Sequence, residues 1–157
     1  MLNKIQIIII LVLIPIGVWY LYMGDKNVGF KDFFFAQTPI VHFDDLPVRV
    51  EIVSTPEALA KGLSGRNTIG EHKQGMFFIF PETGFHGIWM EDMKFAIDIV
   101  WIDENLTVVD IMRNISPDTY PRTFRTEKPI RYVLETEAQY VNLIGIRIGQ
   151  KVRIPLE

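Results

Sequence analysis

Two carboxylates set among apolar residues are the side chains of this sequence that could do chemistry. Asp98 interrupts the apolar run 97–102, and Glu135 stands in a strand expected over residues 131–136. A carboxylate in such a run either faces water by strand alternation or is buried with a partner. If burial raises the pKa of one carboxyl group while the second stays ionised, the two can serve as general acid and base. Asp98 and Glu135 are therefore the candidate acid and base of an enzyme.

Arg66 is a candidate partner for both acids. An arginine fork binds a carboxylate through two parallel hydrogen bonds, so Arg66 with Asp98 and Glu135 could fix a turn onto the sheet. The same three residues could instead receive a small polar ligand. The structural ion pair is the favoured interpretation, because a carboxylate in an apolar strand needs a partner for the chain to fold. A buried pair predicts a cost of about 3–5 kcal/mol for Arg66→Ala and for Asp98→Asn.

Aromatic side chains form a second candidate ligand surface. They are Trp89, Phe85, Tyr120 and Phe124. Exposed rings in a cleft can stack sugars or peptide segments, whereas most tryptophans of a small β domain lie in its core. Tyr120 and Phe124 fall in the stretch 113–129, which is locally basic and rich in proline and lacks periodicity. A loop of this length is functional or loosely ordered, and a solvated crossover is the favoured interpretation.

Metal and nucleophile chemistry find little support. The chain has no cysteine, which excludes disulfides, thiolate metal sites and cysteine nucleophiles. His86 and the acids around it lack the ligand spacing of a zinc or iron site. Ser64 stands in Gly-Leu-Ser-Gly, which is not the Gly-x-Ser-x-Gly elbow of a hydrolase. We therefore expect no metal and no cofactor.

The charge balance argues against nucleic acid as a partner. The formal net charge is −3. Lys4 is the single charged residue among the first 23, so the remainder of the chain is mildly acidic. Binding to nucleic acid depends on the neutralisation of phosphates by clustered lysine and arginine. We expect no nucleic-acid partner.

The N-terminal residues predict a membrane anchor. The segment Ile5–Met23 has no charged residue, and 19 residues in a helix span about 28 Å, close to the hydrocarbon thickness of a bilayer. A cleaved signal peptide is the alternative, but no small-x-small cleavage site follows. We expect an anchor over residues 1–23, a linker over 24–38 and a β domain over 39–157, single-pass and extracytoplasmic. The flanking charges are nearly balanced, which leaves a cytoplasmic domain as the alternative.

The rest of the chain is organised as short strands. Apolar runs rich in aromatic and β-branched residues predict strands over 40–43, 48–53, 76–80, 88–90, 97–102, 107–112 and 131–136. Thr55, Pro56 and Gly62 have the types and spacing of the N-cap, first residue and C-cap of a short helix. Another helical turn is expected within 137–143, and a closing hairpin over 146–154. These elements predict an all-β domain, a sandwich or barrel with one or two short helices, preceded by one transmembrane helix.

Five short motifs occur in an order and spacing that resemble a known family. They are Gly62–Arg66, Gly75–Phe80, Trp89–Met93, Asp98–Asp103 and Val133–Glu135. Together they resemble the domain of unknown function family 192, a prokaryotic group often found exported or membrane-anchored, over about residues 40–155. The resemblance implies a jelly-roll-like β fold and no established activity.

The chain departs from the family's pattern at three places. The family commonly has Met, Asn-Thr and Ala-Gly where this chain has Ser64, Asp92-Met93 and Ala138-Gln139. None of these positions is Arg66, Trp89, Asp98 or Glu135, the residues that a family-wide site would use. The loss of glycine at position 139 is expected to alter the last turn slightly.

The favoured function is a non-catalytic ligand-binding or protein-interaction module of the cell envelope. Its candidate ligand-binding residues are Arg66, Trp89, Asp98, Glu135, Tyr120 and Phe124. The alternative is an enzyme that acts on an envelope polymer or a small metabolite, with Asp98 or Glu135 as acid or base. For the enzyme, Asp98→Asn should abolish activity and leave the free energy of unfolding within about 1 kcal/mol. A third interpretation is a structural partner of another membrane protein.

Overall fold

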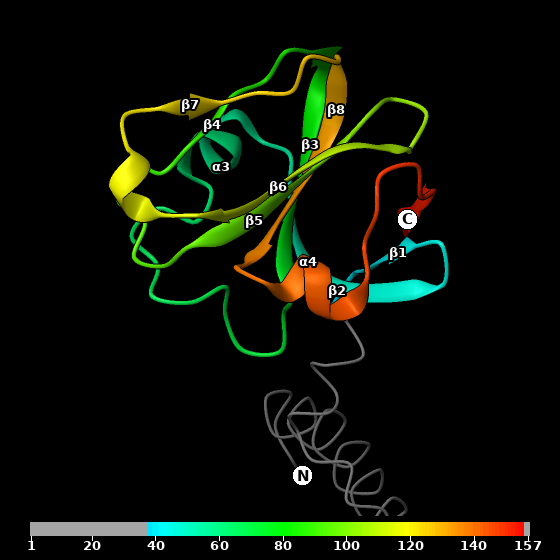
Figure 1. The fold of residues 1–157 in the computed structure, drawn as a ribbon, viewed down its shortest axis with the longest axis horizontal. Helices are drawn as coiled ribbons and strands as arrows, with labels where there is room; N and C mark the ends of the chain where they lie inside the picture. Colours follow the sequence, from blue (N-terminus) through cyan, green and yellow to red (C-terminus); the bar gives the residue numbers. More distant parts are fainter. Residues whose placement is uncertain (1–37, 156–157) are drawn as a thin grey trace, which may run out of the picture. The chain divides into compact units, whose positions relative to one another are not determined.

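A curved sheet of seven strands organises the part of the chain that the computed structural model describes, residues 38–155. Its strands, from one edge to the other, are β6 (Val108–Ile115), β5 (Ile97–Ile102), β8 (Ile130–Glu137), β3 (Gly75–Gly84), β2 (Leu46–Val53), β1 (Ile40–Phe43) and β9 (Val152–Arg153) (Figure 1). A separate two-stranded ribbon pairs β4 (Ile88–Trp89) with β7 (Thr123–Phe124). The predicted all-β class is confirmed.

The predicted anchor over residues 1–23 and almost all of the predicted linker over 24–38 lie outside the described residues. Between residues 38 and 155, no helix is both long enough and apolar enough to cross a membrane. The β domain is therefore described by itself.

The connections differ from those of a jelly roll. Strands β2 and β3 are parallel neighbours, and the chain crosses between them through α3 (Pro56–Lys61). The predicted hairpin over 146–154 is wrong, because β9 pairs with β1 instead. The turn before β9 also bonds to the far edge of the sheet, where Val108 N donates to Gln150 O at 3.0 Å. The two edges are thus drawn toward each other, and the sheet curls into a half-barrel.

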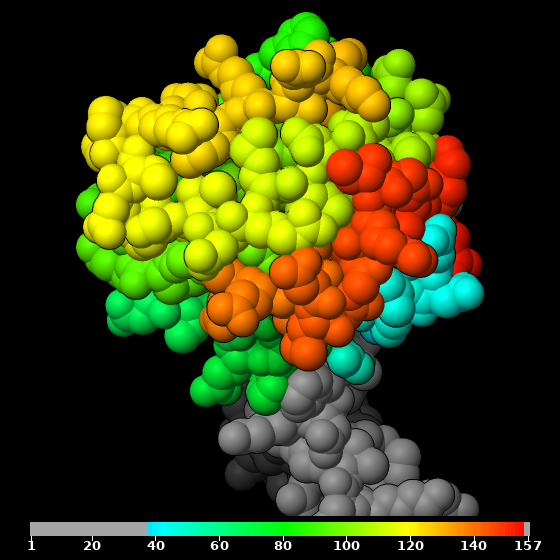
Figure 2. All heavy atoms as spheres, viewed as in Figure 1, coloured from blue at the N-terminus to red at the C-terminus, as the bar shows by residue number. Residues whose placement is uncertain are grey.

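The sheet carries a hydrophobic core on each face. Strand β5 is buried along its whole length, so its residues alternate between the two cores. On one face, which we call the α3 face, lie Met76, Phe78, Ile99, Trp101 and Val133, with Leu59 of α3 packed against them. On the other, the α4 face, lie Val50, Phe77, Val100, Ile102 and Leu134, with Val141 of α4 (Tyr140–Ile144) among them. In the space-filling view, α4 and the C-terminal segment pack directly beside β6 (Figure 2).

Helix α3 forms where its local signals predict it. The hydroxyl of Thr55 accepts a hydrogen bond from Ala58 N at 3.3 Å, and Pro56 occupies the first turn, where its missing N–H costs nothing. The helix ends at Gly62, whose φ of +49° and ψ of −131° favour glycine. A Cβ on Gly62 would lie 3.3 Å from the Phe78 ring. The end of α3 therefore depends on glycine both for its backbone angles and for its close approach to the sheet.

Replacement of Gln139 by glycine is expected to stabilise the domain. Gln139 precedes α4 with a φ of +72°, in the left-handed region, and its side chain makes no capping hydrogen bond. A residue other than glycine costs about 1 kcal/mol in this region, so Gln139→Gly should raise the free energy of unfolding by about 0.5–1 kcal/mol in urea titrations. Leu143→Gly, at an exposed position inside α4, is the matched control and should lower it by about 1 kcal/mol. A lower free energy of unfolding in Gln139→Gly would contradict the inference that the backbone is strained at Gln139.

The stretch 113–129 contains more structure than the predicted loop. Strand β6 extends to Ile115, and the 3-10 turn η1 (Pro117–Thr119) follows, capped by the Ser116 hydroxyl, which accepts from Asp118 N at 3.3 Å. Strand β7 then brings Phe124 into the α3-face core, where it is 6% exposed. The prediction of Phe124 as an exposed ring in a cleft is wrong, because pairing with β4 turns its ring inward.

Candidate functional site

Glu135 lies on the α3 face, in the middle of the sheet. The register places Glu51, Met76, Glu135 and Ile99 side by side on β2, β3, β8 and β5. Residues that are paired across a sheet share a face, so all four side chains stand on the α3 face. The Glu135 side chain is only 4% exposed and is surrounded by the apolar residues of this core. A central strand and its two neighbours therefore hold an acid under the helix α3.

A small pocket opens above Glu135. Its cavity volume is about 40 Å³. It is lined by Leu59, Ala60, Lys61, Gly62, Leu63, Ser64, Phe78, Gly87, Ile88, Trp89, Met93, Ile97 and Glu135. The walls thus come from the end of α3, from β4 and from the sheet. A water molecule needs about 10–15 Å³ on this measure, so the pocket holds a group of a few non-hydrogen atoms.

The carboxyl group of Glu135 has no partner among residues 38–155. In the described range 38–155, no residue makes a hydrogen bond or an ion pair with its oxygens. Burial alone raises the pKa of Glu135 to about 8, because the charged form loses its hydration without compensation. Buried polar groups of folded proteins nearly always have a partner. An unpartnered acid that lines a pocket is therefore the feature of this domain that points most directly to a ligand.

The rim of the pocket is polar and aromatic. Trp89 is 43% exposed, and its indole N–H donates to Glu91 Oε2 at 3.3 Å. Tyr120 is also exposed and donates from its hydroxyl to Glu91 Oε1 at 3.2 Å. The negative charge of Glu91, together with this hydrogen bond, raises the pKa of Tyr120. The Ser64 hydroxyl donates to Glu91 O at 2.7 Å, which ties the turn after α3 to the rim.

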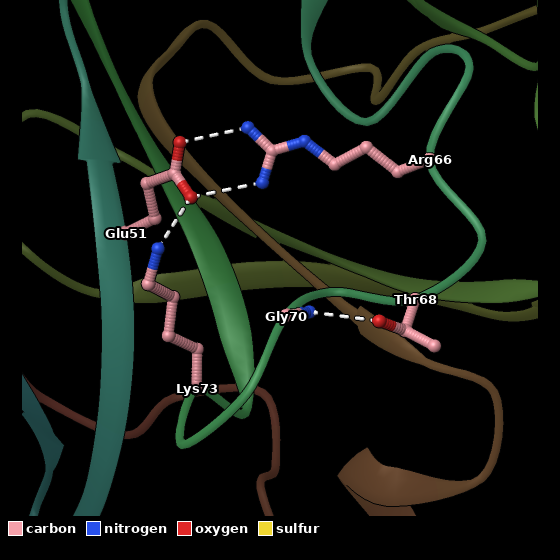
Figure 3. A network of polar contacts seen from close by, with 5 residues as sticks. All are labelled: Glu51, Arg66, Thr68, Gly70 and Lys73. Carbon is pink, nitrogen blue, oxygen red and sulfur yellow. Dashed lines mark hydrogen bonds and ion pairs between the residues drawn. The ribbon is translucent and has the colours of Figure 1, made fainter. Parts of the chain in front are cut away.

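Arg66 pairs with Glu51, not with Asp98 or Glu135 (Figure 3). Its two terminal nitrogens donate to Glu51 Oε2 at 2.9 Å and to Oε1 at 2.8 Å, and Lys73 Nζ donates to Glu51 Oε2 at 2.7 Å. Mainly through the Arg66 bonds, and also through Lys73, the pKa of Glu51 falls to about 2 although partial burial opposes the shift. The predicted pairing with Asp98 and Glu135 is wrong. The bidentate geometry was right, but the carboxylate lies on β2.

Loss of this pairing is expected to cost moderate stability. Arg66 and Glu51 are about a quarter to a third exposed, so Arg66→Ala should lower the free energy of unfolding by about 1–2 kcal/mol at pH 7. A carboxylate whose pKa is lowered in the folded state stabilises the fold at pH values above its pKa in the unfolded chain. This stabilisation is lost as the pH falls through its pKa in the folded state. The stability lost in Arg66→Ala should therefore become smaller as the pH falls from about 4.5 to 2. Urea titrations at several pH values measure it, and the exposed Arg147→Ala is the control. Equal costs at pH 7 and pH 2 would contradict the pairing.

Asp98 is on the opposite face of the sheet from Glu135. It is fully buried, and its two oxygens accept from backbone N–H groups, Oδ1 from Asn114 at 2.8 Å and Oδ2 from Val141 at 3.2 Å. Asn114 belongs to a bulge of β6 and has a φ of +54°, and Val141 is in the first turn of α4. Asp98 and Glu135 thus cannot act on one substrate as acid and base. The geometry gives Asp98 the role of a clamp between β6 and α4.

The structure therefore gathers three of the six predicted site residues. Glu135 and Trp89 line one pocket, and Tyr120 is joined to its rim through Glu91. Arg66, Asp98 and Phe124 are engaged elsewhere. Within residues 38–155, no group of three or more histidines and acids lies close enough together to hold a metal ion.

The sequence interpretation missed Glu51 and Lys73, and it considered Glu91 only as a possible metal ligand beside His86, Asp92 and Asp98. The strand predicted over 48–53 has one wet face, and Glu51 stands on it. No local sequence signal identifies Glu51 as a partner of Arg66 and Lys73, because these cations reach it through the crossover between the parallel strands β2 and β3.

Comparisons with known proteins agree with this β domain. A family model matches residues 40–154, that of the domain of unknown function family 192, described as an uncharacterized ACR. No curated protein matches the chain. A solved protein of unknown function from Novosphingobium aromaticivorans DSM 12444 is similar, with 25% sequence identity, a TM-score of 0.66, and coverage of 73% of this chain and 83% of that chain.

A second solved structure, from Sinorhizobium meliloti 1021, is described as a candidate transcription regulator. It has 24% sequence identity and a TM-score of 0.66, and the match covers 74% of this chain and 91% of that chain. At this identity the likeness supports the fold alone. Because the family model spans nearly all of the described domain, the chain belongs to the domain of unknown function family 192.

Proposed function

We propose that the domain is a non-catalytic binding module of the cell envelope, held at the membrane by residues 5–23. Its ligand site is the pocket above Glu135, with Trp89 in the lining and Tyr120 joined to Trp89 through Glu91. The observation that carries the proposal is the Glu135 side chain, which is buried, unpaired within the described chain and part of the pocket lining. Such a group destabilises the empty protein, so its presence is best explained by a ligand that completes it.

The surroundings of Glu135 support binding without turnover. The Ser64 hydroxyl, a candidate nucleophile in the pocket lining, donates to a backbone carbonyl. A serine nucleophile needs a base that accepts its proton, and in the described structure no base contacts Ser64. Asp98, the predicted second acid, faces the other side of the sheet. The envelope location is supported by the uncharged segment of 19 residues at 5–23.

One observation favours an enzyme as the second candidate. The pKa of Glu135, raised to about 8, would keep its carboxyl group protonated at pH 7 and able to act as a general acid. Glu135 would then act alone, and the substrate would be the envelope polymer or small metabolite of the sequence analysis. Turnover by the wild-type chain that is lost in Glu135→Gln, with ligand binding retained, would favour this second candidate.

A thermal-shift screen of the full-length chain in mild detergent tests the proposal. The compounds are sugars, cell-wall fragments, nucleotides, divalent metals, small acids and small amines. A ligand present at 100 times its dissociation constant stabilises by about 2.7 kcal/mol, which corresponds to a shift of several degrees. The shift should disappear in Trp89→Ala and Glu135→Gln and persist in Phe85→Ala, an exposed aromatic residue outside the pocket lining. No shift with any class would reject the pocket as a ligand site and favour a protein partner.

A further inference from the structure

The pocket presents hydrogen-bond acceptors to whatever enters it. Both oxygens of Glu135 are without a partner in the described chain. The one hydroxyl in the lining, that of Ser64, already donates to Glu91 O at 2.7 Å. A group that brings N–H or O–H donors of its own therefore satisfies the ionised form of Glu135.

The walls restrict the group further. The lining around Glu135 is formed by Leu59, Leu63, Phe78, Met93 and Ile97, with Trp89 at the rim. An anionic group would lie next to Glu135, which is unfavourable when this carboxyl group is ionised. A cation gains from the Glu135 carboxylate and from the faces of aromatic rings. A volume of about 40 Å³ suits the end of an alkyl chain.

We propose that the pocket takes the terminal primary ammonium group of an alkyl chain, with Glu135 as its counter-ion and the Trp89 ring at the mouth. This proposal rests on the proposed function of the pocket as a ligand site. The chemistry is shared by diamines and by lysine side chains of peptides. An ammonium group has three donors, and two of them can satisfy the two oxygens of Glu135.

The charged groups around the pocket set the expected pH behaviour. Lys61, in α3, lines the pocket. Arg66, in the turn that follows α3, is paired with Glu51 on β2, and Glu51 lies beside Met76 in the sheet. From the rim, Glu91 faces Trp89. The neighbours of Glu135 on the sheet, Met76 and Ile99, are uncharged. Lys61 is exposed and could itself reach toward Glu135, so it competes with an ammonium ligand.

The proposal predicts that affinity for an amine rises with pH. Glu135 must release its proton to bind an ammonium ion, and its pKa in the empty protein is about 8. Affinity should therefore increase up to tenfold per pH unit between pH 6 and pH 8 and level off above that, while an alkyl amine stays charged up to about pH 10. Recognition of a neutral donor by the protonated acid would give the opposite trend.

Ligand titrations of the full-length chain, followed by NMR of the small molecules and of the 13C carboxyl resonance of Glu135, test the proposal. The probes are n-butylamine, n-butanol, butyrate and tetramethylammonium, which separate charge from N–H donors at similar size. Butylamine should bind at least tenfold more tightly than the other three. Glu135→Gln should weaken the binding of butylamine at least tenfold. Lys61→Ala should leave this affinity unchanged or increase it. Glu137→Gln, which changes an exposed acid on the same strand, should have no effect.

The outcomes separate this proposal from the proposed function. Butanol or butyrate binding as tightly as butylamine, or amine affinity that falls from pH 6 to pH 8, overturns the ammonium ligand and keeps the pocket as a ligand site. No binding by any probe, together with no hit in the thermal-shift screen, overturns both. If the amine binds, 1,5-diaminopentane and N-acetyl-lysinamide distinguish the sources: tighter binding by the second indicates a lysine of a peptide.

Discussion

Glu135→Gln is expected to remove a pH-dependent loss of stability of about 5 kcal/mol between pH 4.5 and pH 8. Burial raises the pKa of Glu135 from 4.5 to about 8, so the folded protein keeps a proton that the unfolded chain releases. Folded chains then bind more protons than unfolded ones, and the free energy of unfolding falls as pH rises through this window. A tenfold change in an acid dissociation constant corresponds to about 1.4 kcal/mol. The stabilisation by the protonated acid is complete below pH 4.5 and lost above pH 8.

Urea titrations of the full-length chain at pH 4.5, 6, 7 and 8 measure this effect as the difference between wild type and Glu135→Gln. Glutamine has no titrating group, so the two curves should separate progressively as pH rises, with the variant more stable at pH 8. The control is Glu137→Gln, two residues further along β8 and exposed to solvent, which should run parallel to the wild type. Parallel curves for Glu135→Gln would mean that a partner or water already compensates the buried charge.

The same measurement connects stability with the ligand. A bound ammonium ion stabilises the ionised form of Glu135 and would return the pKa toward its usual range. Saturating amine should therefore reduce the loss of stability at pH 8 in the wild type and not in Glu135→Gln. This link follows because a ligand that binds only the folded state stabilises it.

Local signals in the sequence were sufficient for most elements. Thr55, Pro56 and Gly62 mark the two ends of α3 through caps that act within a few residues, and α3 begins and ends where they predict. The apolar run over 97–102 is a fully buried strand, as its composition indicated. Elements of this kind depend on neighbours along the chain, so no knowledge of the fold is needed to find them.

The partners of the site residues depend on contacts between distant segments, and here the prediction was wrong in informative ways. The strand signals placed Asp98 and Glu135 on two strands, and the two acids were expected to share Arg66. The register pairs Glu135 with Ile99, so the two acids face opposite sides of the sheet. A shift of one residue reverses the face of every side chain in a strand, and the sequence of one strand cannot report the register of its pairing. The parallel pairing of β2 with β3, which brings Glu51 to Arg66, was hidden for the same reason.

Short strands explain the remaining differences. Strand β7 has two residues, Thr123 and Phe124, which is too few for any periodicity to be visible. Strand β9 is equally short and pairs with β1, more than a hundred residues earlier in the chain. The predicted hairpin over 146–154 assumed a local partner where the half-barrel provides a distant one. Phe124 was proposed as a ring of a candidate ligand cleft, in a stretch interpreted as a loop, whereas its partner Ile88 places it in the core.

Asp98→Asn is expected to lower the free energy of unfolding by about 3–5 kcal/mol. Each Asp98 oxygen accepts one backbone N–H in a fully buried position, from Asn114 and from Val141. Asparagine has one acceptor oxygen, so its amide N–H₂ would face one of these donors and leave it unsatisfied. Hydrogen bonds to a charged acceptor contribute about 1.5–3 kcal/mol each, and a buried donor left without a partner adds a further penalty.

Urea titrations and amide hydrogen exchange distinguish this clamp from a catalytic role. Exchange at Asn114 and Val141 should accelerate in Asp98→Asn more than exchange in β3, because the bulge of β6 and the start of α4 lose their common anchor. Asp45→Asn, which removes an exposed carboxylate, should stay within about 0.5 kcal/mol of the wild type. If Asp98→Asn left stability within about 1 kcal/mol, the clamp would be rejected and the acid would again need a chemical explanation. The expected loss instead assigns Asp98 to the architecture that joins β5 to the bulge of β6 and to the first turn of α4.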